Sequence, residues 1–373
     1  MPQPSTSIFV LDGEGLQPIG PQPVPTHCDG LDVAWLRQVF EGVGMPGLTG
    51  ATCLDPIVGT ATKMRMGLDW GGRDGPARIM VKGGFSEHRL RMSYIYAHEA
   101  RFFREIAGQL DIIVPRCLAT AEDPAARQYL VMLEDLDLSA TRYCRVTHPL
   151  SRSEAEAFLD VMARLHARFW NDAAFETGGA FETVNRWQAL PTGARGAYLQ
   201  GQLRPETYRD YAAMPRGLAL PQRFHDPALM RAAMERATLF GQERPWCLVH
   251  GDFHLGNLYF TAEGRPGVLD WQTWSRGHWA HDLTYFLISA LDMLDRRRWV
   301  EDLIGHYLER LALHGVVDPP SHRAAMEAFR VHIPYGLCVW LVNPAAFQAE
   351  ANNCAVAPRF ALAAIDHGAF DDL

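Results

Sequence analysis

The stretch LVHGDFHLGN spans residues 248–257, and a second stretch, GVLDWQ, spans residues 267–272. Each of the two blocks begins with apolar residues and ends in acidic or amide side chains. A buried strand that runs into a loop has this composition. The pattern therefore predicts that Asp252, Asn257 and Asp270 lie at one rim of the fold.

The residue types in these blocks suit the transfer of a phosphoryl group from a magnesium-bound nucleotide. The transferred group carries spread negative charge, so a protein must supply metal ligands, a cation and a positioned acceptor. Mg²⁺ prefers hard oxygen ligands, which the amide of Asn257 and the carboxylate of Asp270 provide. We predict that Asp252 accepts the proton of an acceptor hydroxyl or orients that hydroxyl. His254, two positions further on, is placed to contact the γ-phosphate.

Other interpretations of the same residues stay open. On a strand, the alternating side chains of His250, Asp252 and His254 would point to one side and could ligate zinc in a hydrolase. An ordinary polar loop is another interpretation. A catalytically inactive nucleotide-binding regulator is a third, although the complete set of Asp252, Asn257 and Asp270 argues against it.

The rest of the chain predicts an α+β protein with two lobes. Residues 1–25 contain six prolines and predict a loosely ordered arm. Residues 26–134 contain short β-rich runs between glycine clusters, followed by a helical pattern over residues 93–110, which predicts a small antiparallel lobe. Residues 135–373 are mainly helical. Predicted helices there include residues 151–171, 227–241 and 281–294, and the first opens with a capping box.

Lysine is rare in this chain, and its positions are informative. Only two of the 35 basic residues are lysines, Lys63 and Lys82. A lysine in such a chain marks a place where arginine would not serve, although we interpret Lys63 as a chance occurrence. Period-two alternation places Met80 and Lys82 on one face of a strand. The alternative is a surface lysine on an edge strand.

Glu99 lies inside the apolar stripe of the helix predicted after this strand. The stripe includes Ile95 and Phe103, each four positions from Glu99. A buried carboxylate requires a cation or several donors, and Lys82 is the natural partner. The alternative is that Glu99 lies at the margin of the stripe and reaches water.

The two polar blocks together resemble the aminoglycoside phosphotransferase and choline kinase superfamily, which has a protein-kinase-like fold. Asp270 follows Asp252 by 18 positions, as in many protein kinases. Gln272, which follows Asp270 and Trp271, is similar to the ecdysteroid kinase-like branch. The resemblance covers roughly residues 30–365. It implies two lobes, ATP or GTP as the donor, Mg²⁺, and a small-molecule hydroxyl acceptor.

The resemblance also implies roles for residues of the N-terminal lobe. Lys82 would bind the α- and β-phosphates and pair with Glu99, and Met80 would cover the base. The turn that contains Gly59 and Thr60 would cover the phosphates. Glu134 matches the hinge, which would contact adenine through backbone groups.

The resemblance gives roles to two further residues of the C-terminal lobe. Asp282 can cap the helix predicted for residues 281–294, and the resemblance implies that it steadies the Asp252 loop; the two roles are compatible. His166, on the helix predicted for residues 151–171, we interpret as structural.

Bulk properties limit the partners that we expect. The net charge is −8 and the pI is about 6.0, which gives no basic surface for nucleic acid. The apolar stretches are too short to span a bilayer, and the residues before Arg37 lack the charge and the apolar core of a signal peptide. Seven cysteines occur without a C-x-x-C pair, which predicts a reducing, cytoplasmic environment.

Overall fold

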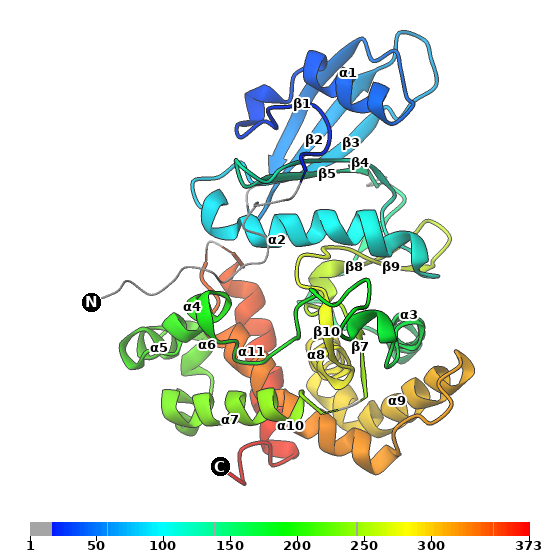
Figure 1. Ribbon diagram of the computed structural model, residues 1–373. Coiled ribbons are helices and arrows are strands. Elements are labelled where there is room, and N and C mark those ends of the chain that lie inside the picture. Colours follow the sequence, from blue (N-terminus) through cyan, green and yellow to red (C-terminus); the bar gives the residue numbers. More distant parts are fainter. Residues whose placement is uncertain (1–16, 58, 137–138, 244, 346) are drawn as a thin grey trace. The chain divides into compact units, whose positions relative to one another are not determined.

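The computed structural model describes residues 17–57, 59–136, 139–243, 245–345 and 347–373 (Figure 1). The chain divides into two compact units. The first unit contains the residues up to Gln109, Ile113–Thr141 and Val268–Thr273, and the second contains Leu110–Ile112, Arg142–Gly267 and Trp274–Leu373.

The arm predicted for residues 1–25 is described only in part, because residues 1–16 lie outside the described residues. In the remainder, Ile19 exchanges two backbone hydrogen bonds with Glu122, and Val24 is buried. This end of the arm therefore belongs to the packed part of the first unit.

An antiparallel sheet forms the centre of the first unit. Its strands lie in the order β1, β2, β3, β5, β4. They span Gly50–Ile57, Thr62–Asp69, Arg78–Gly83, Gln128–Glu134 and Cys117–Asp123, in that spatial order. Each pair of neighbours is antiparallel. The alternation in β3 separates two faces, because Ile79 and Val81 are fully buried in the apolar core that helix α1 (Val33–Gly42) covers.

The other face of the sheet carries Lys82 and packs against helix α2, which spans Arg89–Arg101. The helix predicted for residues 93–110 therefore begins earlier, and its regular part ends sooner. Phe102–Ile106 form a π-helical turn and Ala107–Gln109 a 3-10 turn. After this change of geometry the Phe102 ring stacks on Trp271, with ring centroids 4.0 Å apart. The stacking fixes the segment that contains Asp270 to the end of α2.

The second unit is mainly helical (Figure 1). Its long helices are α3 (Arg152–Arg168), α7 (Pro227–Phe240), α8 (Ala280–Ala290), α9 (Met293–Leu313), α10 (His322–Leu341) and α11 (Glu350–Asp366). Shorter helices are α4 (Gly193–Gln202), α5 (Pro205–Ala212) and α6 (Pro215–Leu218). The predicted capping box is present, because Ser151 and Glu154 bind each other's backbone N–H groups.

Short strands frame the polar loop of the second unit. β7 (Trp246–Val249) pairs with β10 (Ser275–His278), and β6 (Arg142–Tyr143) pairs with β8 (Leu258–Phe260). The third strand of that small sheet is β9 (Pro266–Val268). Because β7 ends at Val249 and β8 begins at Leu258, the block His250–Asn257 is the connection between two buried strands.

The single helix predicted for residues 281–294 is wrong, because α8 and α9 are separate helices. α8 ends at Ala290, and Asp292 caps α9 by accepting a hydrogen bond from the Leu294 N–H. Every residue of α8 is buried, so its apolar residues surround the helix instead of forming one stripe. It packs against α10, α11, α3 and α9.

The predicted α+β fold class is confirmed, with an antiparallel sheet in the first unit and helices in the second. In the part of the chain that the structure describes, no helix is both long enough and apolar enough to cross a bilayer.

Candidate active site

Lys82 is the centre of the polar cluster in the first unit. Its Nζ lies 2.8 Å from Glu99 Oε1 and 2.8 Å from Asp270 Oδ1. Lys82 and Glu99 are 5% and 2% exposed, so the pair is largely removed from water. Gln272 Nε2 lies 3.5 Å from the second oxygen of Glu99. The predicted Lys82–Glu99 pair is therefore present, and Asp270 joins it.

The buried charges of this cluster shift one another's protonation. Burial alone would lower the pKa of Lys82, but the charges of Asp270 and Glu99 outweigh it, so its pKa lies above the ordinary value. Burial raises the pKa of Glu99, and the charge of Lys82 offsets only part of this effect. Lys82 consequently remains a cation at neutral pH.

Asp270 has an unusual backbone conformation. Its φ of +61° lies in the left-handed region, which residues other than glycine rarely occupy. The segment is fixed on both sides, because the Val268 N–H donates to the Ile113 carbonyl and Trp271 stacks on Phe102. Strained residues of this kind cluster at functional sites. In this conformation the Asp270 carboxylate contacts Lys82.

The turn predicted to cover the phosphates is tied to the beginning of α2. The Thr60 carbonyl accepts hydrogen bonds from the Tyr96 hydroxyl at 2.6 Å and from His88 Nε2 at 3.1 Å. Val58 lies outside the described residues. A Cβ on Gly59 would meet only ordinary contact, 3.5 Å from the Ala61 carbonyl oxygen, so sterics do not require glycine there.

Two other residues that we predicted to bind the nucleotide lie on β3 itself and on the neighbouring strand β5. Met80 is half-buried on the same face of β3 as Lys82. Glu134 ends β5, where its carboxylate accepts a hydrogen bond from the Arg116 N–H at 3.0 Å. The structure thus brings Lys82, Glu99 and Asp270 into contact. In the sheet, Met80 pairs with Leu133, and Glu134 pairs with Ile79.

The polar loop of the second unit is fixed by one buried carboxylate. Asp282, on α8, accepts hydrogen bonds from the backbone N–H groups of His250 at 2.6 Å and Gly251 at 2.9 Å. Gly251 has a φ of +84°, which glycine adopts without strain. The Gly251 carbonyl lies 2.9 Å from His281 Nε2. Of the two interpretations of Asp282, steadying the loop is confirmed, since its side chain binds the loop backbone.

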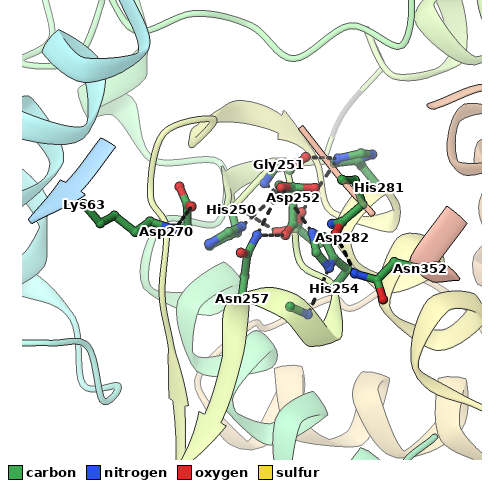
Figure 2. A network of polar contacts seen from close by, with 12 residues as sticks. Lys63, His250, Gly251, Asp252, His254, Asn257, Asp270, His281, Asp282 and Asn352 are labelled. Atoms are coloured by element: carbon green, nitrogen blue, oxygen red, sulfur yellow. Dashed lines mark hydrogen bonds and ion pairs between the residues drawn. The ribbon is translucent and has the colours of Figure 1, made fainter. Parts of the chain in front are cut away.

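Asp252 is the accessible carboxylate of this loop. Its side chain is 39% exposed, whereas His254 is buried. Asn257 Nδ2 donates to the backbone oxygen of Asp252 at 2.9 Å and to its Oδ2 at 3.1 Å. Figure 2 shows Asp252, His254 and Asn257 turned towards one another. Because both Asn257 N–H bonds point to Asp252, the amide Oδ1 remains as an acceptor.

The tautomer of His254 follows from its hydrogen bond. Its Nδ1 accepts the Gly256 N–H at 3.0 Å, so the neutral ring carries its proton on Nε2. Nε2 lies 3.5 Å from Asp252 Oδ2, which is too long for a strong hydrogen bond. The Nε2–H therefore points to the region of the Asp252 carboxylate, where it can donate a hydrogen bond to an anion.

His166, which the sequence analysis interpreted as structural, supports this loop through Asp282. His166 Nε2 lies 3.3 Å from Asp282 Oδ2, and its Nδ1 lies 2.7 Å from the Tyr307 hydroxyl. Burial alone would raise the pKa of Asp282, but the His166 hydrogen bond and the nearby histidines outweigh it, so its pKa is lowered. The signal for His166 was its position, a polar residue inside an apolar helical stripe.

Tyr285 also contacts the loop and could not be predicted from its motif. Burial raises its pKa well above the usual range, and the charge of Asp252 and a hydrogen bond with that carboxylate add to the shift. Tyr285 is thus a neutral hydroxyl beside Asp252. Trp340, on α10, packs edge-on against His254 with ring centroids 5.2 Å apart.

The zinc interpretation of His250, Asp252 and His254 is not favoured by their contacts. These residues form a loop instead of a strand, and the Nδ1 atoms of both histidines accept backbone N–H groups. Among the described residues, no three His, Cys, Asp or Glu side chains are grouped so that they could hold a metal ion.

Solved structures with a similar fold include one named as a phosphotransferase and two named as kinases. The GDP complex of a mutant of aminoglycoside 2′-phosphotransferase-IIIa has a TM-score of 0.51 at 10% identity and covers 91% of this chain and 99% of its own. Plasmodium vivax ethanolamine kinase has a TM-score of 0.50 at 10% identity, with coverage of 90% and 87%. Choline kinase from Cryptosporidium parvum has the same TM-score and identity, with coverage of 87% and 91%. These similarities confirm the protein-kinase-like fold.

Sequence comparison identifies the family. None of the curated protein sequences matches the chain significantly. The model of the phosphotransferase enzyme family matches residues 96–324, which is more than half of the chain and includes both polar blocks. The superfamily resemblance is thereby confirmed, while the ecdysteroid kinase-like branch stays a prediction. The chain belongs to the phosphotransferase enzyme family.

Proposed function

We propose that this protein is an ATP-dependent phosphotransferase that moves a γ-phosphoryl group to a hydroxyl of a small-molecule acceptor. The observation that carries the proposal is the buried cation Lys82, held 2.8 Å from both Glu99 and Asp270. A buried ammonium group that is paired with two carboxylates suits a polyphosphate site, because it is oriented in advance and stays charged.

In the proposed nucleotide site, Lys82 binds the α- and β-phosphates and Glu99 orients it. The turn at Gly59 and Thr60 covers the phosphates, with its Thr60 carbonyl fixed by Tyr96. Met80 covers the base, and the backbone at Glu134 binds adenine or guanine. ATP is the donor that we favour, and GTP is the alternative.

The proposed ligands of Mg²⁺ are Asn257 and Asp270. The residues fit the ion, because both offer hard oxygen atoms. The Asp270 carboxylate already attracts cations, with two ammonium groups within 4 Å. The Asn257 Oδ1 is left as an acceptor by the two hydrogen bonds that its Nδ2 makes. When bound, Mg²⁺ would neutralise charge on the phosphates.

Asp252 is the proposed catalytic base. The acceptor oxygen attacks the γ-phosphorus, the bond from phosphorus to the β–γ bridging oxygen breaks, and the hydroxyl proton passes to the Asp252 carboxylate. Asn257 and Tyr285 orient that carboxylate. The Nε2–H of His254 would contact the γ-phosphate. The loop keeps its shape because Asp282 binds the N–H groups of His250 and Gly251.

The proposal is tested by nucleotide binding followed by turnover. The thermal midpoint should rise when Mg-ATP is added, since a ligand at 100 times its dissociation constant stabilises a protein by about 2.7 kcal/mol. ADP release should then be measured with amino alcohols, aminoglycosides, sugars and steroid-like alcohols. A rise in the midpoint without ADP release on any acceptor would favour the inactive regulator. A protein that binds neither ATP nor GTP and contains stoichiometric zinc would overturn the proposal.

A further inference from the structure

The only two lysines of the chain contact the same carboxylate. Lys82 Nζ lies 2.8 Å from Asp270 Oδ1, and Lys63 Nζ lies 3.8 Å from Asp270 Oδ2. Figure 2 shows the Lys63 side chain extended towards Asp270. The other 33 basic residues are arginines. Because every lysine of the chain is at Asp270, the interpretation of Lys63 as a chance occurrence is no longer sufficient.

The two lysines also lie directly opposite each other in the sheet. Lys63 on β2 pairs with Lys82 on β3 in the antiparallel register, so their side chains share one face. Like charges at such a pair destabilise a sheet unless anions lie between them. Here Glu99 and Asp270 provide two negative charges for the two positive ones, and the charge of Lys63 also lowers the pKa of Glu99.

Carboxylates held by arginine in the same chain show a different arrangement. The Asp135 side chain is 1% exposed, and Arg65 Nε lies 3.1 Å and 3.0 Å from its two oxygens. Asp366 is bound through both oxygens by Arg297. Each carboxylate also binds a second arginine, Arg78 at Asp135 and Arg296 at Asp366, so guanidinium groups occupy both of its oxygens. These pairs connect parts of the fold permanently.

An ammonium group leaves the carboxylate exchangeable. It is a point charge that requires only one oxygen, and Lys63 at 3.8 Å is beyond hydrogen-bond distance of Asp270 Oδ2. Its side chain is 40% exposed, whereas that of Lys82 is 5% exposed. The Lys63 head therefore has room to turn from Asp270 to another anion.

We propose that Lys63 is a second phosphate-binding cation, which shares Asp270 with the metal and contacts the nucleotide when Asp270 binds that metal. This inference rests on the proposed function. Once a divalent cation takes Asp270, the opposed ammonium groups lose one of their two anions, and phosphate oxygens are the replacement. Lysine instead of arginine at both positions keeps Asp270 accessible to the metal.

The test compares two substitutions of Lys63 with a control. Lys63→Gln should weaken binding of Mg-ATP by about tenfold, the loss of one charge-assisted contact. Binding of adenosine, which has no phosphate, should stay within about twofold of the wild type. Lys63→Arg keeps the charge but can occupy both oxygens of Asp270, so the Mg²⁺ concentration for half-maximal nucleotide binding should rise about fivefold. Arg91→Gln removes an exposed charge of the same unit and should change none of these values.

The outcomes separate this inference from the function on which it rests. If the wild type binds no nucleotide, the proposed function fails and the role of Lys63 fails with it. If the wild type binds Mg-ATP but Lys63→Gln binds it equally well, only the role of Lys63 is wrong. Equal weakening for ATP and adenosine would show that Lys63 acts through folding. An unchanged Mg²⁺ requirement in Lys63→Arg would contradict the exchange at Asp270.

Discussion

Lys82 and Asp282 are the buried charges around which the two units arrange their polar residues, and they are held differently. Lys82 is held by two other side chains, those of Glu99 and Asp270. Asp282 is held by backbone N–H groups of His250 and Gly251, which move only if the loop moves. The Lys82 cluster therefore depends on side-chain contacts alone, whereas the Asp282 cluster fixes the backbone of a loop.

The largest expected effect is in the fixed loop, at its exposed carboxylate. Asp252→Asn should lower turnover by about a thousandfold, because an amide cannot accept the acceptor's proton. Nucleotide affinity should remain, since the proposed phosphate ligands are untouched. Steady-state ADP release and a binding titration measure the two quantities. Asp302→Asn, which alters an exposed carboxylate of the same unit, is the matched control. Full turnover in Asp252→Asn would show that Asp252 is not the catalytic base.

The next effect concerns the shape of that loop. Asp282→Asn should lower the free energy of unfolding by about 3 kcal/mol. The carboxylate accepts hydrogen bonds from two backbone N–H groups, whereas the amide of asparagine would place its own N–H donors against one of them. Denaturant unfolding followed by fluorescence measures the loss, and Asp302→Asn again provides the control. A variant as stable as the wild type would mean that the loop does not depend on Asp282.

The third prediction concerns the cluster of Lys82, Glu99 and Asp270, where a substitution should change the response of the thermal midpoint to nucleotide. Lys82→Ala should abolish the rise of the thermal midpoint with Mg-ATP, a response of about 2.7 kcal/mol at 100 times the dissociation constant. The substitution also leaves Glu99 buried without Lys82. The double variant Lys82→Ala/Glu99→Gln should therefore recover the midpoint measured without nucleotide and still lack the response. A response that persists in both variants would place the nucleotide elsewhere.

The sequence predicted the parts of the site that depend on local pattern. Alternation placed Lys82 and Met80 on one face of a strand, and helical spacing placed Glu99 in a buried stripe; the structure has both. The contact between Lys82 and Asp270 joins residues 188 positions apart, and local spacing cannot predict such a contact. The break between α8 and α9 was missed because apolar residues continue through it, and Asp292 acts there as a cap. Only packing could reveal that His166 faces Asp282.

The weakest effect that we predict is a pH dependence of stability caused by buried histidines of the second unit. Burial lowers the pKa of His332 to about 3 and also lowers the pKa values of His278 and His281. These histidines bind protons in the unfolded chain below pH 6.5 but stay neutral in the second unit. As the pH is lowered below 6.5, the free energy of unfolding should therefore decrease, by at most about 1.4 kcal/mol per pH unit for each histidine.

A substitution of His332 tests this pH dependence directly. His332→Phe keeps a ring of similar size and should make the decline in thermal midpoint between pH 6.5 and pH 5 shallower. His322→Phe, at an exposed histidine of the same helix, should leave the slope unchanged. Equal slopes in the wild type and in His332→Phe would mean that His332 takes up a proton in the folded unit. His332 would then accept a charge inside the fold, and the second unit would not be fixed in all its buried polar positions.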